Sequence, residues 1–178
     1  FEWFSDSEVM IAHTSESNGT PKEIILTKKN MRKSANMTGK YLYLQHGNSA
    51  LLAMPVTYIA GKLMLIRAME IGLKLICIQP TSHILLDEIN KGINQKLDAI
   101  DFVALTPMQV ENSIDFVSKC KKLIIGGAPL SDKVKQELFP FDNEVYETYA
   151  MTETITHIAF KQVANQKFPN VKNAFEAF

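Results

Sequence analysis

Three loops of the sequence combine hydroxyl, glycine and charged residues in a way that suits phosphate and metal binding. The first, TSESNGTPK at residues 14–22, contains one glycine and one lysine among polar side chains. Gly19 lets backbone amides approach a ligand, and Lys22 adds a positive charge. Its other hydrogen-bond donors are Thr14, Ser15, Ser17, Asn18 and Thr20. Such a loop can surround phosphate oxygens, although an ordinary surface turn uses the same residue types.

The second and third loops add a flat surface, an aromatic ring and a carboxylate. In IIGGAPLS, Gly126 and Gly127 would let a planar ring lie against the backbone. In ETYAMTET, Tyr149 and Glu153 stand among the hydroxyls of Thr148, Thr152 and Thr154. An aromatic ring can stack on a base, and a carboxylate can hold Mg²⁺ beside phosphates. The alternatives are a tight strand-to-helix turn for the second loop and a capped helix start for the third.

The common phosphate-binding fingerprints are absent from the sequence. Neither GxxxxGK[ST] nor GxGxxG occurs in the chain. Their absence argues against a P-loop protein and against a dinucleotide-binding protein. Any nucleotide site must therefore use a different loop pattern.

An alternation of strands and helices is expected to position these loops. Short apolar runs predict strands at residues 8–13, 23–26, 50–54, 73–78, 101–105, 122–127, 144–149 and 157–163. Helices are predicted at residues 59–72, 84–96, 107–120 and 131–138, with Gly72 as a stop, Pro107 at a first position and Ser131 as a cap. This order predicts an α/β fold with a doubly wound, mostly parallel sheet flanked by helices. Ligands of such folds bind where loops leave the carboxyl ends of the strands.

Amino-acid composition argues against some classes of binding partner and indicates the cellular compartment of the protein. The chain has 178 residues, 46% of them hydrophobic, which suits one domain with a sizeable core. Lys plus Arg and Asp plus Glu balance at 19 each, which argues against binding nucleic acid or an anionic membrane surface. Cys77 and Cys120 lack the spacing of a zinc site or disulfide scaffold, which indicates a reducing cytoplasm. The sequence does not decide whether the protein forms a homo-oligomer.

The chain is expected to be a piece of a longer protein, and its most apolar segment is not expected to be a transmembrane helix. Its most apolar segment, residues 50–72, is interrupted by Pro55, Lys62, Arg67 and Glu70. The sequence opens with FEWFSDSEVM, which has no initiator Met and no signal-peptide pattern. Its other end, FPNVKNAFEAF, has no obvious stop.

Four motifs in order resemble the core motifs of a known superfamily. TSESNGTPKE, MPVTYIAG, IIGGAPLS and YAMTET are similar to successive motifs of the adenylate-forming acyl-CoA synthetases, the AMP-binding enzymes. Within that superfamily, YAMTET followed by THIA, with PVTYIAGK and LTPMQV upstream, most resembles the o-succinylbenzoate CoA ligases of menaquinone biosynthesis. The resemblance implies a ligase that uses ATP, Mg²⁺ and coenzyme A. It would join a small-molecule carboxylate to coenzyme A through an acyl adenylate.

The resemblance also implies roles for individual residues at a nucleotide site. The first loop of the superfamily wraps the ATP β and γ phosphates, which here would involve Thr14, Ser15, Ser17, Gly19, Thr20 and Lys22. Adenine would lie against Gly126, Gly127 and Ala128, with Tyr149 stacked on it. Thr152 would meet the α-phosphate and Glu153 would bind Mg²⁺, so these two and Lys22 are the implied catalytic residues. The remaining nucleotide-binding residues would be Thr148, Ala150 and Met151.

The resemblance also implies an acyl pocket. It would use Tyr58, Ala60, Gly61, Thr106, Pro107 and residues 126–129. His157 is added as a substrate-binding residue, with a hydrogen-bonded core histidine as the alternative. For a second carboxylate on the substrate, the sequence offers Lys62, Gln109 and His157, and Lys62 is expected to be solvated.

The expected chemistry also agrees with what the sequence lacks. A carboxylic acid with a pKa near ~4 is ionised at neutral pH and needs no general base to attack a phosphate. No Ser/His/Asp arrangement is apparent. Catalysis would come from aligning two anions and neutralising their repulsion with Lys22, Mg²⁺ and backbone amides.

Coverage of the superfamily pattern is incomplete. Residues 1–178 are expected to form the AMP-binding core region, without the superfamily's amino-terminal segment or its small carboxyl-terminal domain. The chain alone is therefore expected to have little or no ligase activity. Two alternatives remain open: a nucleotide-binding module that has lost catalysis, and an α/β domain with no nucleotide site.

Glu16 is the departure from the superfamily pattern with the largest expected effect. The superfamily usually has Gly at this position, Thr or Ser at Asn18 and Gly at Ala150. A carboxylate about 6 Å from one phosphate charge costs roughly 1 to 3 kcal/mol, and a side chain in a left-handed conformation adds ~1 to 2 kcal/mol. Replacing Glu16 with glycine is therefore expected to tighten ATP binding by about tenfold or more. Calorimetry checks this, and an unchanged or weaker Kd would contradict the assignment of this loop.

Overall fold

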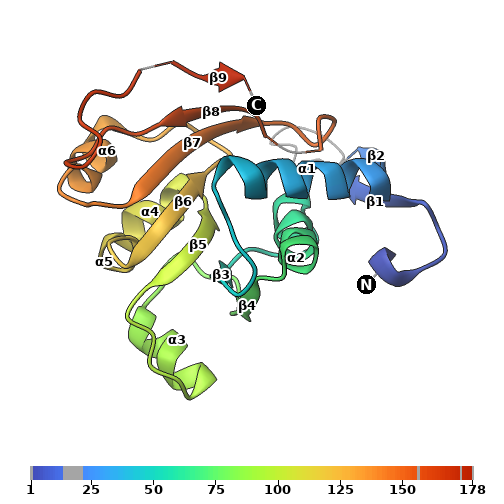
Figure 1. Ribbon diagram of the computed structural model, residues 1–178, viewed down its shortest axis with the longest axis horizontal. Helices are drawn as coiled ribbons and strands as arrows, with labels where there is room; N and C mark the ends of the chain where they lie inside the picture. The colour runs from blue at the N-terminus through green and yellow to red at the C-terminus, as the bar shows by residue number, and fades with distance from the viewer. Residues whose placement is uncertain (1, 14–21, 156, 173, 178) are drawn as a thin grey trace.

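The computed structural model describes residues 2–13, 22–155, 157–172 and 174–177, whose strands form two sheets (Figure 1). The smaller is a hairpin of β1 (Val9–His13) and β2 (Glu23–Thr27). The larger has the strand order β4-β3-β5-β6-β7-β8-β9 in the described part of the chain. Its strands are β3 (Ser49–Leu52), β4 (Lys74–Cys77), β5 (Ile100–Leu105), β6 (Cys120–Ile125), β7 (Glu144–Ala150), β8 (His157–Gln162) and β9 (Glu176–Ala177).

The larger sheet is mostly parallel, as the sequence predicts. Strands β4, β3, β5, β6 and β7 run parallel, while β8 and β9 are antiparallel to their neighbours. The helices between the parallel strands are α2 (Ile59–Ile71), α3 (Leu86–Ile93), α4 (Pro107–Asn112), α5 (Ile114–Val117) and α6 (Asp132–Leu138). The carboxyl ends of the parallel strands therefore meet at one edge of the sheet, and the predicted loops follow them there.

Helices cover both faces of the larger sheet (Figure 1). On one face, Met64 of α2 packs in a core cluster with Phe102 of β5 and Ile124 of β6. On the other face, Val110 of α4 and Val134 of α6 belong to a second core cluster with the alternate residues of the same strands. Successive strand side chains point to opposite faces, so each central strand contributes to both cores.

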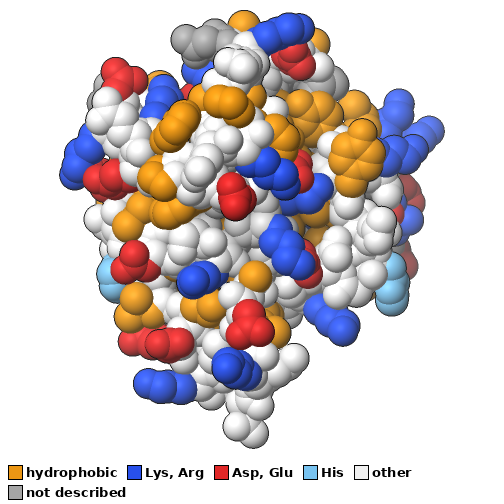
Figure 2. Space-filling model, turned by 60° about the vertical axis from the view of Figure 1, so that its left-hand side comes forward, with side chains coloured by type: hydrophobic (Ala, Val, Ile, Leu, Met, Phe, Trp, Pro, Cys, Tyr) orange, Lys and Arg blue, Asp and Glu red, His pale blue; other side chains and the backbone are white. Residues whose placement is uncertain are grey.

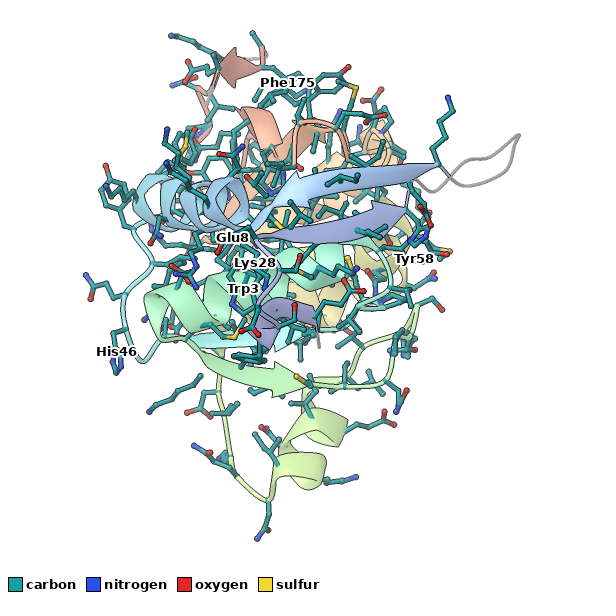
Figure 3. The ribbon with its side chains drawn as sticks, turned by 90° about the vertical axis from the view of Figure 1, so that its right-hand side faces the viewer. Trp3, Glu8, Lys28, His46, Tyr58 and Phe175 are labelled. Carbon is teal, nitrogen blue, oxygen red and sulfur yellow. The ribbon has the colours of Figure 1, made fainter. Side chains whose placement is uncertain are left out.

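The β1–β2 hairpin has its own small core and lies beside the helices. Its inward side chains pack against α1 (Lys28–Tyr41), α2 and the short 3₁₀ helix η1 (Glu2–Phe4), through Trp3, Met10, Ala12, Leu26, Met31, Ala35, Leu63 and Ile66. Glu8 and Lys28 mark one end of the hairpin in Figure 3, and Tyr58 lies near the other end. His13 forms a parallel bridge with Tyr58, which ties that end to the start of α2.

Local sequence signals account for most helix boundaries. Gly72 ends α2 in the left-handed conformation at φ 77°. Pro107 begins α4 after a capping box between Thr106 and Gln109. Ser131 caps α6 by accepting from the backbone of Val134.

Some elements differ from the prediction. The predicted helix over residues 107–120 is two helices, because Ser113 leaves the helical conformation and its hydroxyl accepts from the Ile84 amide at 2.9 Å. The first two predicted strands pair with each other in the separate hairpin. Helix α1, α5 as a separate helix and the short β9 were not predicted.

Charged side chains of both signs are mixed on one face of the molecule. Lys and Arg side chains are interspersed with Asp and Glu over the face in Figure 2. Among the described residues, no helix combines the length and the apolar character that crossing a bilayer would require.

Candidate active site

A pocket of about 520 Å³ lies at the carboxyl edge of the parallel strands, between the sheet and α2. Residues just after β3, β5, β6 and β7 line one side, and the first two turns of α2 line the other. This is the position where a doubly wound fold binds its ligand. Eleven predicted site residues line it: Tyr58, Ala60, Thr106, Gly126, Gly127, Thr148, Ala150, Met151, Thr152, Glu153 and His157. The structure thus brings together the second and third loops and the start of α2.

A neighbouring pocket of about 460 Å³ shares Thr106, Gly126 and Gly127 with the first. It adds Pro107, Ala128 and Pro129, three further predicted residues. Predicted residues Gly61 and Tyr149 line neither pocket. The side chain of Tyr149 is 51% exposed and its ring lies 6.4 Å from that of Phe175. Tyr149 is therefore available at the surface next to the loops but does not wall either cavity.

The flat surface expected at Gly126 and Gly127 depends on close packing with β7. The hydroxyl of Thr148 donates to the Ile125 carbonyl at 3.0 Å, directly before the glycines. A Cβ atom on Gly126 would lie 2.9 Å from that hydroxyl oxygen. Gly127 adopts φ 95°, a conformation that favours glycine. Both glycines thus have a structural reason to be present as well as a suggested adenine-facing role.

Glu147 anchors the far end of the same loop. Its Oε1 accepts from the Leu130 amide at 2.9 Å, and its Oε2 lies 2.9 Å from Lys161 Nζ and 3.7 Å from Lys135 Nζ. Burial alone would raise the pKa of this carboxyl group, but the Leu130 amide and the two lysines hold it below its usual value. The loop over residues 126–130 is consequently fixed at its start by Thr148 and at its end by Glu147.

The first predicted loop is only partly described. Thr14, Ser15, Ser17, Gly19 and Thr20 lie outside the described residues, as does Glu16. Lys22 is described and exposed, directly before β2. Because Glu23 pairs with His13 and His13 bridges to Tyr58, this end of the hairpin lies beside a wall of the pocket.

Gly61 lets the start of α2 pack directly on the backbone that follows β3. A Cβ atom there would lie 2.3 Å from the Pro55 carbonyl oxygen and 2.7 Å from its carbon. Replacing Gly61 with alanine is therefore expected to lower the free energy of unfolding by roughly 1 to 3 kcal/mol, because backbone has to move. Urea denaturation checks this. Gly92 is the matched control, since a Cβ atom there meets nothing within 4 Å and Gly92→Ala is expected to stabilise α3 by up to about 1 kcal/mol.

Arg67 is a pocket residue that the sequence reasoning did not identify as functional. Its side chain is 2% exposed, and the guanidinium lines the pocket from α2. One nitrogen donates to the thioether of Met64 at 3.2 Å, and the group lies 5.6 Å from the centre of the Phe102 ring. Its Nε has no hydrogen-bond partner among the described residues. Burial lowers the pKa of Arg67 to about 10, so it remains a cation at neutral pH.

A helical spacing could have revealed Arg67. Ala60, Leu63 and Arg67 follow one another at intervals of three and four residues, which places them on one face of a helix. All three line the pocket. An arginine on the face shared with a predicted acyl-pocket residue was therefore a visible signal.

His157 meets Arg67 in the same pocket. The imidazole packs edge-on against Phe160 with ring centres 5.1 Å apart, and its Nδ1 has no partner among the described residues. Burial and the charge of Arg67 together lower the pKa of His157 to about 3. The histidine is thus neutral, and its Nδ1 has no hydrogen bond within the described part of the chain, unlike that of an ordinary core histidine.

The two other candidates for a second carboxylate have structural roles. Lys62 was expected to be solvated, but its side chain is 13% exposed and its ammonium donates to the Ile11 carbonyl at 2.6 Å. Gln109 donates to the carbonyls of Ala53 and Thr81 and accepts from the Thr106 amide. Neither lines the pocket. Because the Lys62 side chain is mostly buried and hydrogen-bonded, the expectation that it is solvated was wrong.

A metal ion could be held at Glu153 only with help from a ligand. The carboxylate is exposed at the mouth of the pocket, within the turn closed by Met151 and Thr154. Among the described residues no group of three or more His, Cys, Asp or Glu side chains could bind a metal by itself. Mg²⁺ commonly binds through one carboxylate together with substrate phosphates and waters, which fits a single carboxylate here.

Fold and site together define a ligand-binding α/β domain of the kind found in adenylate-forming enzymes. Residues 3–174 match the AMP-binding enzyme family, and the chain belongs to that family. It is 26% identical over 164 residues to the 2-succinylbenzoate–CoA ligase of Bacillus cytotoxicus, covering 88% of this chain and 33% of that protein. The chain therefore spans about a third of the length of the curated relatives that it matches.

Solved structures agree on the fold. An acyl-CoA synthetase (AMP-forming)/AMP-acid ligase II-like protein from Dyadobacter fermentans superposes with a TM-score of 0.83 at 33% identity, over 99% of this chain and 49% of that one. The O-succinylbenzoate coenzyme A synthetase of Bacillus subtilis, in complex with ATP and magnesium ion, has a TM-score of 0.71 at 19% identity, over 85% of this chain and 32% of its own. The predicted mostly parallel sheet and the predicted superfamily are thus confirmed.

Proposed function

We propose that the full-length parent of this chain is an ATP-dependent acid–thiol ligase that converts o-succinylbenzoate to o-succinylbenzoyl-CoA in menaquinone biosynthesis. Residues 1–178 would supply its AMP-binding core, acting in the cytoplasm. The curated relatives act on 2-succinylbenzoate by name, and a structural neighbour binds ATP and magnesium. Because the chain spans a third of those relatives, the proposal concerns the whole parent and not this chain alone.

Arg67 is the observation that carries the substrate proposal. A buried cation without a carboxylate partner costs several kcal/mol, and the protein recovers that cost if a ligand supplies the anion. The acid that is activated must reach the nucleotide at the mouth of the pocket, near Thr152 and Glu153. An acid that also satisfies Arg67, deep on α2, needs a second carboxylate. o-Succinylbenzoate has one carboxylate on its chain and another on its ring.

The chain's own residues would bind, orient and neutralise. Gly126, Gly127 and Ala128 would face the adenine, and Thr152 would donate to the α-phosphate. Mg²⁺ held by Glu153 would offset phosphate charge, and Lys22 would add a second cation from the hairpin. The substrate carboxylate would then attack the α-phosphorus with pyrophosphate as the leaving group, and the thiol of coenzyme A would displace AMP.

Pyrophosphate exchange by the full-length parent tests this proposal. Exchange is expected with o-succinylbenzoate, and much less with 4-oxo-4-phenylbutanoate, which lacks the ring carboxylate, or with fatty acids. Exchange that is fastest with monocarboxylates would contradict the substrate proposal.

Departures from the superfamily pattern at Glu16 and Ala150 favour one alternative, a nucleotide-binding module without catalysis. Silence with every acid beside measurable ATP binding would support that module.

A further inference from the structure

His157 enters the pocket differently from the loop residues around it. It is the first residue of β8, which runs antiparallel to β7, and it pairs with Ala150 across an irregularity in the β7–β8 register. The other strand-derived lining residues, such as Ala104, Ile124 and Thr148, come from the ends of parallel strands. The His157 side chain therefore reaches the pocket from the first residue of β8, whereas the other strands contribute residues from their carboxyl ends.

Two residues that each have an unpaired buried nitrogen line this pocket. Within the described residues, the buried side-chain nitrogen atoms without a hydrogen bond are Arg67 Nε and His157 Nδ1. Both residues line the same pocket. Most buried polar groups in proteins are paired, so two unpaired nitrogens on residues that line one cavity mark that cavity as a functional site.

The imidazole of His157 is best described as a hydrogen-bond donor. With its pKa lowered to about 3, the ring carries one proton at neutral pH. Nδ1 is shielded and has no acceptor near it in the described chain, and a buried N–H without an acceptor is rarer than an unsatisfied lone pair. The positive charge of Arg67 also favours a lone pair. The proton is therefore assigned to Nε2.

We infer that His157 determines specificity by donating a hydrogen bond from Nε2 to an uncharged acceptor, a carbonyl oxygen, that neighbours the second carboxylate of the acid substrate. This inference rests on the proposed function and extends it. Arg67 supplies the charge that selects a dicarboxylate, whereas the neutral ring of His157 selects a keto acid among dicarboxylates. A carbonyl oxygen accepts such a bond without competing with Arg67 for the carboxylate.

The test compares two acids with the full-length parent. One is o-succinylbenzoate, and the other is 2-(3-carboxypropyl)benzoate, in which a methylene replaces the ketone. The unaltered enzyme is expected to prefer the keto acid by about tenfold or more in kcat/KM for pyrophosphate exchange, because a site built to hydrogen-bond a group rejects the analogue that lacks it. His157→Phe keeps the aromatic packing on Phe160 but has no donor. It is expected to bring the ratio of the two kcat/KM values close to one.

Two further variants make the result specific. His157→Gln retains an N–H donor and is expected to keep part of the preference, while His83→Phe changes a histidine outside the pocket and is expected to keep all of it. Calorimetric Kd values for the two acids give the same comparison without turnover. If His157→Phe slows both acids by the same factor, the inference is overturned and the proposed function stands. If the unaltered parent uses neither acid, the proposed function fails and the inference falls with it.

Discussion

Replacing Arg67 with methionine is expected to stabilise the parent ligase while removing most of its activity toward a dicarboxylate. The guanidinium is buried and no described carboxylate balances it. Replacing buried charge with an apolar side chain of similar length is often neutral or stabilising, here by up to about 4 kcal/mol. Losing the partner of a buried substrate carboxylate costs about 100-fold or more in kcat/KM. Thermal denaturation and pyrophosphate exchange measure the two effects on the same variant.

Opposite signs for stability and activity separate a functional arginine from a structural one. Replacing an arginine that has only a structural role would lower both the stability and the activity of the protein. Arg32 is the matched control, because its side chain is 57% exposed and it pairs with Glu70 at the surface. Arg32→Met is expected to change the free energy of unfolding by less than about 1 kcal/mol and to leave the acid preference unchanged. A stability loss for Arg67→Met with full activity toward o-succinylbenzoate would contradict the role given to Arg67.

Replacing Glu147 with leucine is expected to destabilise the protein by about 3 to 5 kcal/mol and to raise the KM for ATP. The variant leaves Lys161 and Lys135 without their shared anion, and breaking a buried ion pair by removing one partner is strongly destabilising. It also removes the acceptor for the Leu130 amide, which holds the end of the loop proposed to face adenine. Urea denaturation and ATP titration of the initial rate measure these effects. Glu137→Leu is the control, because Glu137 pairs with Lys133 at the surface and such pairs contribute less than about 1 kcal/mol.

The pH dependence of stability provides a second measure of Glu147. Its pKa is lowered in the folded protein, so the unfolded state takes up a proton first as the pH falls. The stabilisation is full above the unfolded pKa of about 4.3 and is lost as the pH falls through the folded value. Glu147→Gln is expected to reduce stability most at neutral pH and to flatten the loss below about pH 4. A variant whose acid unfolding parallels that of the unaltered protein would contradict this contribution.

Strand positions and loop locations were readable from the sequence because they depend on local patterns. Buried strands such as β5 and β6 are short apolar runs, and Gly72, Pro107 and Ser131 fix helix ends through backbone geometry. Since parallel strands deliver their following loops to one edge, the meeting of the second and third loops followed from topology. These features required no knowledge of tertiary contacts.

Features that depend on tertiary contacts were missed. Helix α1 buries small or polar residues such as Ser34, Ala35 and Thr38, so its apolar periodicity is weak. Hairpin pairing of β1 with β2 is decided by packing on α1 and α2, which apolar runs alone do not encode. The position of Arg67 on the pocket face of α2 was visible in the sequence, but the lack of a hydrogen-bond partner for its Nε among the described residues depends on the tertiary structure.

The reversal of strand direction between β7 and β8 has a consequence for how such enzymes diversify. The loops proposed to bind the nucleotide follow the carboxyl ends of parallel strands. Hydrogen bonds of Thr148 and Glu147 fix the loop over residues 126–130 to the sheet. His157 sits across a register irregularity from them, on a strand whose hydrogen bonds continue regardless of its side chain. With the role proposed for His157, exchange of this one residue would change which acid is accepted and would leave the loops proposed to bind the nucleotide unaltered.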